Sequence, residues 1–334
     1  MTSALSNGKP MSLSTGDVLS AIAGAELAGS RAAVSYGEFF TDTRKPCRGG
    51  MFVAISGERY DGNRFLQEAA DAGAAGAIIG SSAPEDTLLP EGLQCFRVAD
   101  TLAALQDLAA WHRHLCTRVR VVGITGSNGK STTKQLTLSV CSKAFTTQAT
   151  AGNLNNHIGV PLTLLGLDPD TELMITEMAA NHPGEIRCLA SLARPVVSLI
   201  TNIMPTHLEG FSSLEGILQA KLELFEQTGS QGTLIFNGDD ELLRGAVGRF
   251  SQEKITFGLG HTNQVKPFEV ILAGAARYSF TLRPGSRHIH LPVPGRHNIY
   301  NALAAAAVGR ALGIADEEIA AGIEHASGLK MRME

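Results

Sequence analysis

The chain has 334 residues, of which 44% are hydrophobic and 18% are charged, and its formal net charge is −4 at pH 7. This length and composition favour a globular protein of two domains. The net charge gives no sign of a basic nucleic-acid-binding surface. No apolar run is long enough to span a membrane, and residues 1–11 lack the apolar core of a signal peptide. The five cysteines form no CxxC pair, so we expect reduced, buried thiols and a cytoplasmic protein.

The first half of the chain, up to about residue 118, predicts an α/β domain. Short apolar runs are typical of buried strands, and helical spacing of the apolar residues between them predicts helices. The longer helix is expected to begin at Asp100 or Thr101, since both side chains can cap a helix N-terminus. We expect strands at 51–56 and 75–80 and helices at 63–74 and 100–115, in a domain over residues 12–118.

The second half, residues 119–328, alternates strands and helices, which predicts a mainly parallel sheet. The expected strands are 119–125, 173–178, 196–201 and 232–237, and the expected helices are 130–145, 185–193 and 213–227. Around 268–293 the hydrophobic period changes to two, which predicts an antiparallel hairpin appended to the sheet. Two further helices are expected at 298–312 and 315–326.

A glycine-rich segment from Gly123 to Thr132 lies between the first strand of this half and the helix after it. Its glycines allow a tight turn whose N–H groups point at anionic oxygens, and the helix N-terminus adds positive charge. In such a loop Lys130 reaches the β- and γ-phosphates of a nucleotide, and Ser131 or Thr132 holds Mg²⁺. The spacing departs from GxxxxGK[ST], because position 124 is Ile. The alternative is an ordinary glycine-rich turn.

Two polar residues follow later strands of the same sheet. Glu177 comes directly after the apolar run 173–176. A carboxylate at the carboxyl end of a parallel strand suits a metal ion beside bound phosphates. His207 follows the strand at 196–201 through a short segment. The alternatives are a solvated glutamate and a histidine with a structural role.

Lys221 lies in a predicted helix that opens with a capping box of Ser212 and Glu215. It is at the centre of an apolar arc made by Leu214, Ile217, Leu218, Leu222, Leu224 and Phe225, with Glu215, Gln219, Glu223 and Glu226 opposite. A charged lysine on an apolar stripe is unfavourable unless it is paired, chemically modified or extended toward solvent. Extension toward solvent is the alternative to a functional role.

In their order and spacing, these residues resemble the Mur ligase family, which builds the peptide of bacterial cell-wall precursors. The resemblance covers the chain from about residue 12, and the segment 125–132 matches the family's ATP-binding loop, including its departure from the usual spacing. It implies an α/β fold with an N-terminal UDP-sugar-binding domain and a central P-loop ATPase domain. The implied activity is ATP-dependent amide formation through an acyl phosphate.

The resemblance also implies roles for individual residues. The implied ATP contacts are Gly126, Ser127, Asn128, Gly129, Lys130, Ser131 and Thr132, with Asn237, Asp239, His297, Asn298 and Asn301 around the adenosine. Glu177 and His207 match the family's metal-binding glutamate and histidine, and Lys221 matches a lysine that members often carry as a carbamate. With Ser131 these residues would hold Mg²⁺, and the implied catalytic residues are Lys130, Glu177, His207 and Lys221.

Three segments point to the substrates. The segments 152–161 and 180–186 resemble the branch of the family that acts on UDP-N-acetylmuramoyl-tripeptide and D-alanyl-D-alanine. The segment 41–44, with 61–63, resembles the UDP-sugar site, although the family often has His where this chain has Asn63. The implied contacts are Thr41, Asp42, Thr43, Arg44, Asn153, Asn155, Asn156, Asn181 and His182. We expect a monomer with no membrane or nucleic-acid partner.

The family has a third, Rossmann-like C-terminal domain, and residues 329–334 match the start of the linker to it. We expect this domain to be absent, so that the site for the incoming amine is incomplete. The alternatives within the family are the ligase that adds the third peptide residue and folylpolyglutamate synthase. Outside it they are a non-catalytic binder of UDP-sugar and ATP, and a kinase or switch ATPase.

Overall fold

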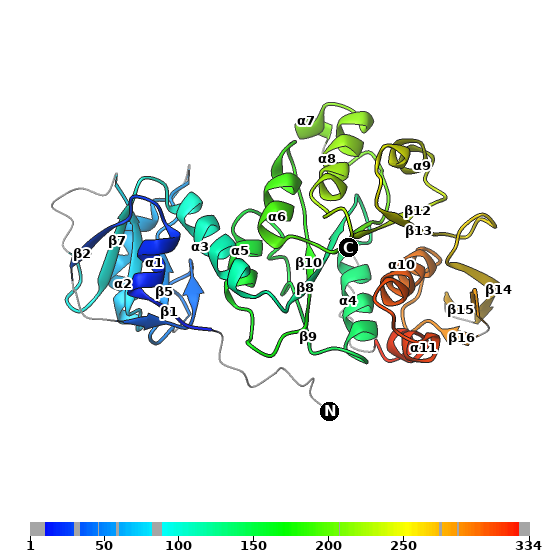
Figure 1. Cartoon of the computed structure of the whole chain (residues 1–334), viewed down its shortest axis with the longest axis horizontal. Helices are drawn as coiled ribbons and strands as arrows, with labels where there is room; N and C mark the ends of the chain where they lie inside the picture. The colour runs from blue at the N-terminus through cyan, green and yellow to red at the C-terminus, as the bar shows by residue number, and fades with distance from the viewer. Residues whose placement is uncertain are drawn as a thin grey trace. The chain divides into compact units, whose positions relative to one another are not determined.

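Figure 1 shows the computed structural model of the chain, which describes residues 11–29, 34–45, 47–57, 60–81, 89–206, 208–273, 276–285 and 287–326. The contacts divide the chain into one unit of residues 1–117 with 157–170, and another of residues 118–156 with 171–334. From the sequence, residues 157–170 are expected in the second domain. The structure groups them with the first unit, because helix α5 (Gly159–Leu165) packs against α3 (Thr101–Leu115).

The first unit is built on a five-stranded sheet in the order β2-β7-β6-β5-β4. Its neighbouring strands are parallel, except that β2 runs antiparallel to β7. The strands are β2 (Glu26–Gly29), β4 (Phe39–Phe40), β5 (Met51–Val53), β6 (Gly76–Gly80) and β7 (Gln94–Val98). Helix α1 (Thr15–Ala21) and the antiparallel pair β1 (Leu13–Ser14) and β3 (Ser35–Tyr36) belong to the same unit.

The helix expected at 100–115 is confirmed as α3, whereas the helix expected at 63–74 differs. Asp100 caps α3, since its carboxylate accepts from the N–H groups of Leu102 and Ala103. The helix expected at 63–74 is a 3₁₀ turn, η1 (Gly62–Phe65), followed by the short α2 (Leu66–Asp71). Asp61 starts η1 by accepting from the N–H of Asn63. The sequence therefore locates these elements better than it predicts their ends.

The second unit is built on a six-stranded parallel sheet in the order β13-β12-β11-β8-β10-β9. The strands are β8 (Arg120–Thr125), β9 (Thr147–Ala149), β10 (Leu173–Glu177), β11 (Val197–Ile200), β12 (Thr233–Asn237) and β13 (Glu253–Phe257). The chain places β9 and β10 on one side of β8 and the later strands on the other. Ligands of such sheets bind beyond the carboxyl ends of the strands where this order reverses, which here is the end of β8.

Helices cover both faces of this sheet (Figure 1). Helix α4 (Lys130–Cys141) packs with α10 (His297–Ala311) and α11 (Asp316–Glu324), whereas α6 (Glu185–Ala193) packs with α8 (Leu214–Glu226). Gly322 lets α11 approach α4 closely, because a Cβ there would lie 2.5 Å from the Cα of Val140. The remaining helical pieces are α7 (Leu208–Phe211), α9 (Glu241–Ala246) and η2 (Val247–Arg249).

The hairpin expected around 268–293 is instead a separate antiparallel sheet of three strands, β14 (Lys266–Ala273), β15 (Arg277–Arg283) and β16 (Arg287–His290). Its inward side chains, Phe280, Leu282 and Ile289, belong to the core formed by α4, α10 and α11. The period-two pattern therefore indicates the strands correctly. It cannot indicate that they pack on helices rather than extend the main sheet.

None of the five cysteines forms a disulfide; Cys47, Cys95 and Cys141 are buried and the other two are half-buried. Among the helices that the structure describes, none is long and apolar enough to cross a bilayer.

Candidate functional site

The glycine-rich loop leaves the central strand β8 after Thr125 and enters α4 at Lys130. Two of its glycines are required by geometry. Gly126 and Gly129 have φ values of 141° and 80°, and a Cβ would lie 2.0 Å from Thr201 Oγ1 at Gly126 and 2.5 Å from Asn301 Oδ1 at Gly129. The turn can therefore form only with glycine at both positions.

The segment after β11 fixes the loop from one side. Thr201 Oγ1 donates to the Asn128 carbonyl at 2.7 Å, and the Asn128 N–H donates to Asn202 Oδ1 at 3.0 Å. Ser127 Oγ donates to the Met204 carbonyl at 2.9 Å. These hydrogen bonds form within the folded unit and hold the loop in its turn.

The start of α4 has the properties of an anion site. Gly129 is the N-cap, no described side chain caps this end, and its first turn carries no acidic residue. The free N–H groups and the helix dipole therefore favour a negative ligand. Lys130, Ser131 and Thr132, three of the predicted contacts, occupy this first turn.

Lys130 lies folded over the loop. Its Nζ donates to the carbonyls of Gly126 at 2.8 Å and Ser127 at 2.9 Å. Burial lowers the pKa of Lys130, and the negative charge of Glu177 partly opposes that shift. A cation held against the loop, within the field of a carboxylate, is suited to binding phosphate oxygens.

Glu177 ends β10 and is 1% exposed, so the alternative of a solvated glutamate is wrong. Its Oε1 accepts from Ser131 Oγ at 3.0 Å and from Asn155 Nδ2 at 2.9 Å. Its Oε2 lies 3.3 Å from Lys134 Nζ, a contact that is an ion pair without hydrogen-bond geometry. The carboxylate thus joins the phosphate loop to two other segments of the unit.

The donor set around Glu177 fits Mg²⁺, which prefers oxygen ligands. Ser131 and Glu177 bring a hydroxyl and a carboxylate oxygen to within 3.0 Å of each other at the start of α4. Within the described ranges, no three His, Cys, Asp or Glu side chains come together. His207, the histidine expected beside them, lies outside the described residues.

Lys221 is buried at 3% exposure on α8, so the alternative of extension toward solvent is wrong. Its Nζ lies 5.6 Å from the centre of the Phe211 ring. Burial first, and then the charge of Lys130, lower its pKa to about 8. A primary amine with this pKa is partly neutral near physiological pH, and a neutral amine can react with CO₂.

Two details of α8 differ from the sequence analysis. The N-cap is Ser213, whose Oγ accepts from the Gly216 N–H at 3.0 Å. Ser212 has a φ of 62° and does not adopt the extended conformation of an N-cap. Glu223, expected on the exposed side, is 6% exposed because it accepts from the N–H groups of Gly184 and Arg187 at the start of α6.

The residues expected around adenosine lie on β12, the loop after it and the start of α10. Asn301 Oδ1 accepts from Thr133 Oγ1 at 3.2 Å, and its Nδ2 donates to Asn298 Oδ1 at 2.8 Å, which ties the start of α10 to α4. Asp239 accepts from the N–H groups of Leu259 and Gly260, from Asn263 Nδ2 and from Tyr300 OH. Asn237 Oδ1 accepts from the Asp239 N–H, and His297 is the first residue of α10.

The residues expected to contact the peptide substrate lie on two loops of the second unit. Asn153 and Asn156 are exposed, and Asn155 binds Glu177. The N–H groups of Asn181 and His182 donate to Glu185 at 2.7 and 3.2 Å. Glu185 thus shapes this loop from within the helix that follows it.

In the first unit, the segment 41–44 is on the surface. Arg44 donates to both carboxylate oxygens of Asp42, each at 2.7 Å, while Thr41 and Thr43 are half-buried. Asn63 is buried, where Oδ1 accepts from the Gly80 N–H at 3.0 Å and Nδ2 donates to Asp61.

Lys134, which is 1% exposed beside Glu177, is not among the residues predicted from the sequence. The sequence did contain a signal for this residue. Lys134 lies three residues before Thr137 and seven before Cys141, so all three share one face of the helix, and that face is buried. A lysine on the inward face of the helix after a phosphate loop requires a buried anionic partner.

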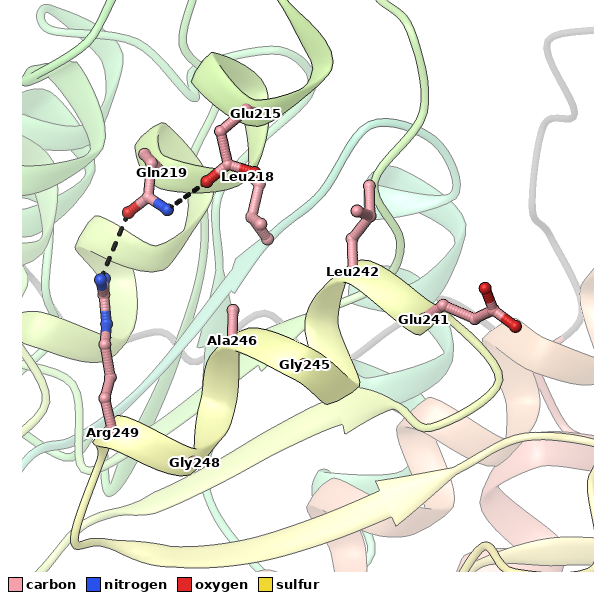
Figure 2. Close-up of a pocket in the computed structure, with 9 residues that line it drawn as sticks. All are labelled: Glu215, Leu218, Gln219, Glu241, Leu242, Gly245, Ala246, Gly248 and Arg249. Atoms are coloured by element: carbon pink, nitrogen blue, oxygen red, sulfur yellow. Dashed lines mark hydrogen bonds between the residues drawn. The ribbon is translucent and has the colours of Figure 1, made fainter.

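An open cleft of about 630 Å³ lies between α8 and the α9–η2 segment (Figure 2). Leu218, Leu242 and Ala246 line it, with Glu215 and Glu241 at its edges. It shares no residue with the phosphate loop or with the contacts of Glu177. We therefore assign the candidate site to the loop rather than to this cleft.

The chain is similar in sequence and fold to proteins of one family. The profile of the Mur ligase middle domain matches residues 124–309. The UDP-N-acetylmuramoyl-tripeptide–D-alanyl-D-alanine ligase of Bacillus subtilis is 40% identical over 298 residues, which cover 88% of this chain and 63% of that protein. The chain therefore spans less than two thirds of the length of this relative.

Two solved structures share the fold. MurF from Acinetobacter baumannii superposes with a TM-score of 0.86 at 32% identity, covering 98% of this chain and 71% of that one. MurF from Thermotoga maritima, in complex with ADP, superposes with a TM-score of 0.72 at 27% identity, covering 85% and 65%. The matched profile extends over more than half of the chain and includes the loop and Glu177. The chain belongs to the Mur ligase family.

Proposed function

We propose that this chain acts in an ATP-dependent ligase that joins D-alanyl-D-alanine to UDP-N-acetylmuramoyl-tripeptide during peptidoglycan precursor synthesis. The observation that carries the proposal is a preformed phosphate loop with Lys130 and Ser131 beside the buried carboxylate of Glu177. The name of the Bacillus relative and the ADP in the Thermotoga structure support the choice of substrates.

In the proposed reaction, the terminal carboxylate of the tripeptide attacks the γ-phosphorus of ATP. ADP leaves and an acyl phosphate forms. The amine of D-alanyl-D-alanine then attacks the acyl carbon, phosphate leaves, and the nitrogen loses a proton. Because both steps bring anions together, the protein acts mainly by positioning the reactants and neutralising charge.

The loop and the start of α4 bind the phosphates in this proposal. Lys130 exchanges its loop carbonyl partners for phosphate oxygens, which keeps a cation beside the transferring group. Ser131 and Glu177 would hold Mg²⁺ together with His207, and the ion would supply further charge neutralisation. Asn301, bonded to Asn298, ties the start of α10 to α4 on the proposed adenosine side.

We propose that Lys221 is carbamylated. The ammonium group first loses one proton. The neutral amine then attacks CO₂, forms an N–C bond and releases a second proton, so that overall a cation becomes an anion. Its burial and its pKa of about 8 support this reaction. Labelling with ¹³C-bicarbonate should give one carbamate carbon signal at pH 8 that Lys221→Met lacks. A signal of equal intensity in the variant would exclude Lys221.

The peptide substrate is proposed to bind between the segments 153–156 and 180–186, and the UDP group at 41–44 in the first unit. These contacts follow the family resemblance. The peptide site is supported by one contact in the structure. Asn155 donates to Glu177, which also accepts from Ser131, so the segment 153–156 lies next to the phosphate loop.

The decisive experiment measures the first half-reaction, since it needs no amine. Labelled ADP should exchange into ATP only when UDP-N-acetylmuramoyl-tripeptide is present, and the dipeptide precursor should support much less exchange. With D-alanyl-D-alanine added, mass spectrometry should find the amide product. Exchange that prefers the dipeptide would favour the ligase for the third residue, and a phosphorylated product would indicate a kinase. Binding of both ligands without exchange would indicate a non-catalytic protein.

A further inference from the structure

Lys134 is a buried cation next to the phosphate loop. It is 1% exposed on α4, one turn after Lys130. Its Nζ donates to the carbonyls of Thr150 at 2.8 Å and Gly152 at 3.1 Å, and lies 3.3 Å from Glu177 Oε2. Three oxygens thus surround the ammonium group: two carbonyls accept its hydrogen bonds, and the carboxylate oxygen forms an ion pair without hydrogen-bond geometry. We therefore do not expect Lys134 to bind a phosphate.

Stability alone does not account for this pair. Two charges are removed from water, and replacing a buried ion pair by apolar residues of similar size is often neutral or stabilising. Inward positions on the same helix are filled by Leu136 and Val140. A methionine at 134 with an apolar residue at 177 would satisfy the same packing, so the charges require another explanation.

The contacts of Glu177 supply that explanation. Lys134 holds one oxygen of the carboxylate, Oε2, while the other, Oε1, is turned to Ser131 on the phosphate loop and to Asn155. Since the carboxylate is planar, holding Oε2 also fixes the direction of Oε1. The two backbone carbonyls that Lys134 binds fix the start of the segment that carries Asn155.

We propose that Lys134 is a positioning residue that orients Glu177 toward the phosphate loop and ties it to the segment 150–155. This inference rests on the proposed function, because it assumes that Glu177 faces the Mg²⁺ of a bound nucleotide. Lys134 itself touches neither nucleotide nor metal. Partners that orient a metal ligand typically change metal affinity by about 10- to 100-fold when they are removed.

The test is calorimetry of ATP binding with Mg²⁺ and with EDTA, since the ratio of the two affinities isolates the contribution of the metal. In Lys134→Met, we expect the affinity in EDTA to stay within about twofold and the Mg²⁺-dependent gain to fall about 10- to 100-fold. Lys143→Met, at an exposed lysine shortly after the same helix, is the matched control and should keep the gain.

A double-variant cycle separates positioning from a general structural role. Glu177→Gln should lose the same Mg²⁺-dependent gain. The double variant Lys134→Met/Glu177→Gln should lose no more than either single change, because Lys134 acts through Glu177. Losses that add up would overturn the proposal, and so would an equal loss of affinity with and without Mg²⁺.

Two further outcomes keep the test decisive. If Lys134→Met does not fold, Lys134→Arg retains a buried cation but presents a planar group that cannot reach the same three oxygens in the same way. An unchanged Mg²⁺-dependent gain in that variant overturns the proposal. If the parent chain itself shows no such gain, the proposed function fails with it. The other case is a parent chain that shows the Mg²⁺-dependent gain. If Glu177→Gln then loses this gain while Lys134→Met keeps it, the proposed function stands and only the role of Lys134 is excluded.

Discussion

Two ion pairs in the predicted site segments differ in almost every physical respect. In the first unit, Asp42 and Arg44 are 39% and 87% exposed and are paired two residues apart. In the second unit, Lys134 and Glu177 are 1% and 2% exposed, and come from positions 43 residues apart in the chain (177 − 134). The first pair forms locally on the surface, whereas the second exists only when the whole unit is folded.

The difference indicates how each site is prepared for its ligand. Arg44 holds the pKa of Asp42 at about 2 through a hydrogen bond, but exposed pairs are screened and contribute little to stability. Such side chains are free to change partners when an anionic ligand arrives. The buried pair cannot do so without leaving a charge unsatisfied. We therefore expect the nucleotide site to be preorganised, and the surface segment to adapt on binding.

The largest effect is expected from Lys130→Ala. The change removes a cation that backbone N–H groups cannot replace, and truncating one partner of a buried charged hydrogen bond costs about 2–5 kcal/mol. The Kd of Mg·ATP should therefore rise by about 30-fold or more. Calorimetry on the folded variant measures this, with the exposed Lys143→Ala as control. A normal affinity in Lys130→Ala would show that the loop does not bind the phosphates.

The next largest effect is expected when each of the two ion pairs is broken and the losses of stability are compared. Glu177→Gln leaves Lys134 buried without an anion, so the second unit should lose about 3–5 kcal/mol of unfolding free energy. Asp42→Asn should leave the first unit's denaturation midpoint unchanged, because that pair is exposed. The single tryptophan, Trp111 in α3, reports on the first unit, and amide hydrogen exchange in β8 and β10 reports on the second. Equal shifts in both units would remove the distinction between the pairs.

Lys221 tests whether a buried lysine that forms no ion pair among the described residues behaves differently from Lys134. Its pKa falls from the ordinary 10.5 to about 8 in the folded chain, so the unfolded chain binds more protons between these values. The unfolding free energy of the second unit should therefore rise with pH across that window, by at most about 3 kcal/mol. Denaturation in CO₂-free buffer measures the rise, and Lys221→Met should abolish it. If the unfolding free energy of the variant still rises with pH, another titrating group causes the rise.

The sequence predicts the parts of the site that are local in the chain. The phosphate loop follows from the order of strand, glycines and helix within 123–132, and Glu177 follows from its place at a strand end. The contacts of Lys134 with Thr150, Gly152 and Glu177 depend on how β9, β10 and α4 pack, which no local pattern contains. Glu223 shows the same limit, because an apolar arc on one helix cannot show that the start of α6 covers the other side.

The smallest effect concerns the start of α8, where the sequence places the cap one residue too early. Ser213 Oγ accepts from the Gly216 N–H, so Ser213→Ala should cost the second unit about 1 kcal/mol. Ser212 has a φ of 62°, a conformation that glycine adopts without strain. Ser212→Gly should therefore be neutral or stabilise the unit by up to about 1 kcal/mol. Both serines are exposed, so burial cannot explain a difference between them. Hydrogen exchange in α8 measures the stability change in each variant. Ser212→Ala is the comparison for the cap: if it destabilises the unit more than Ser213→Ala does, the capping box expected from the sequence is correct.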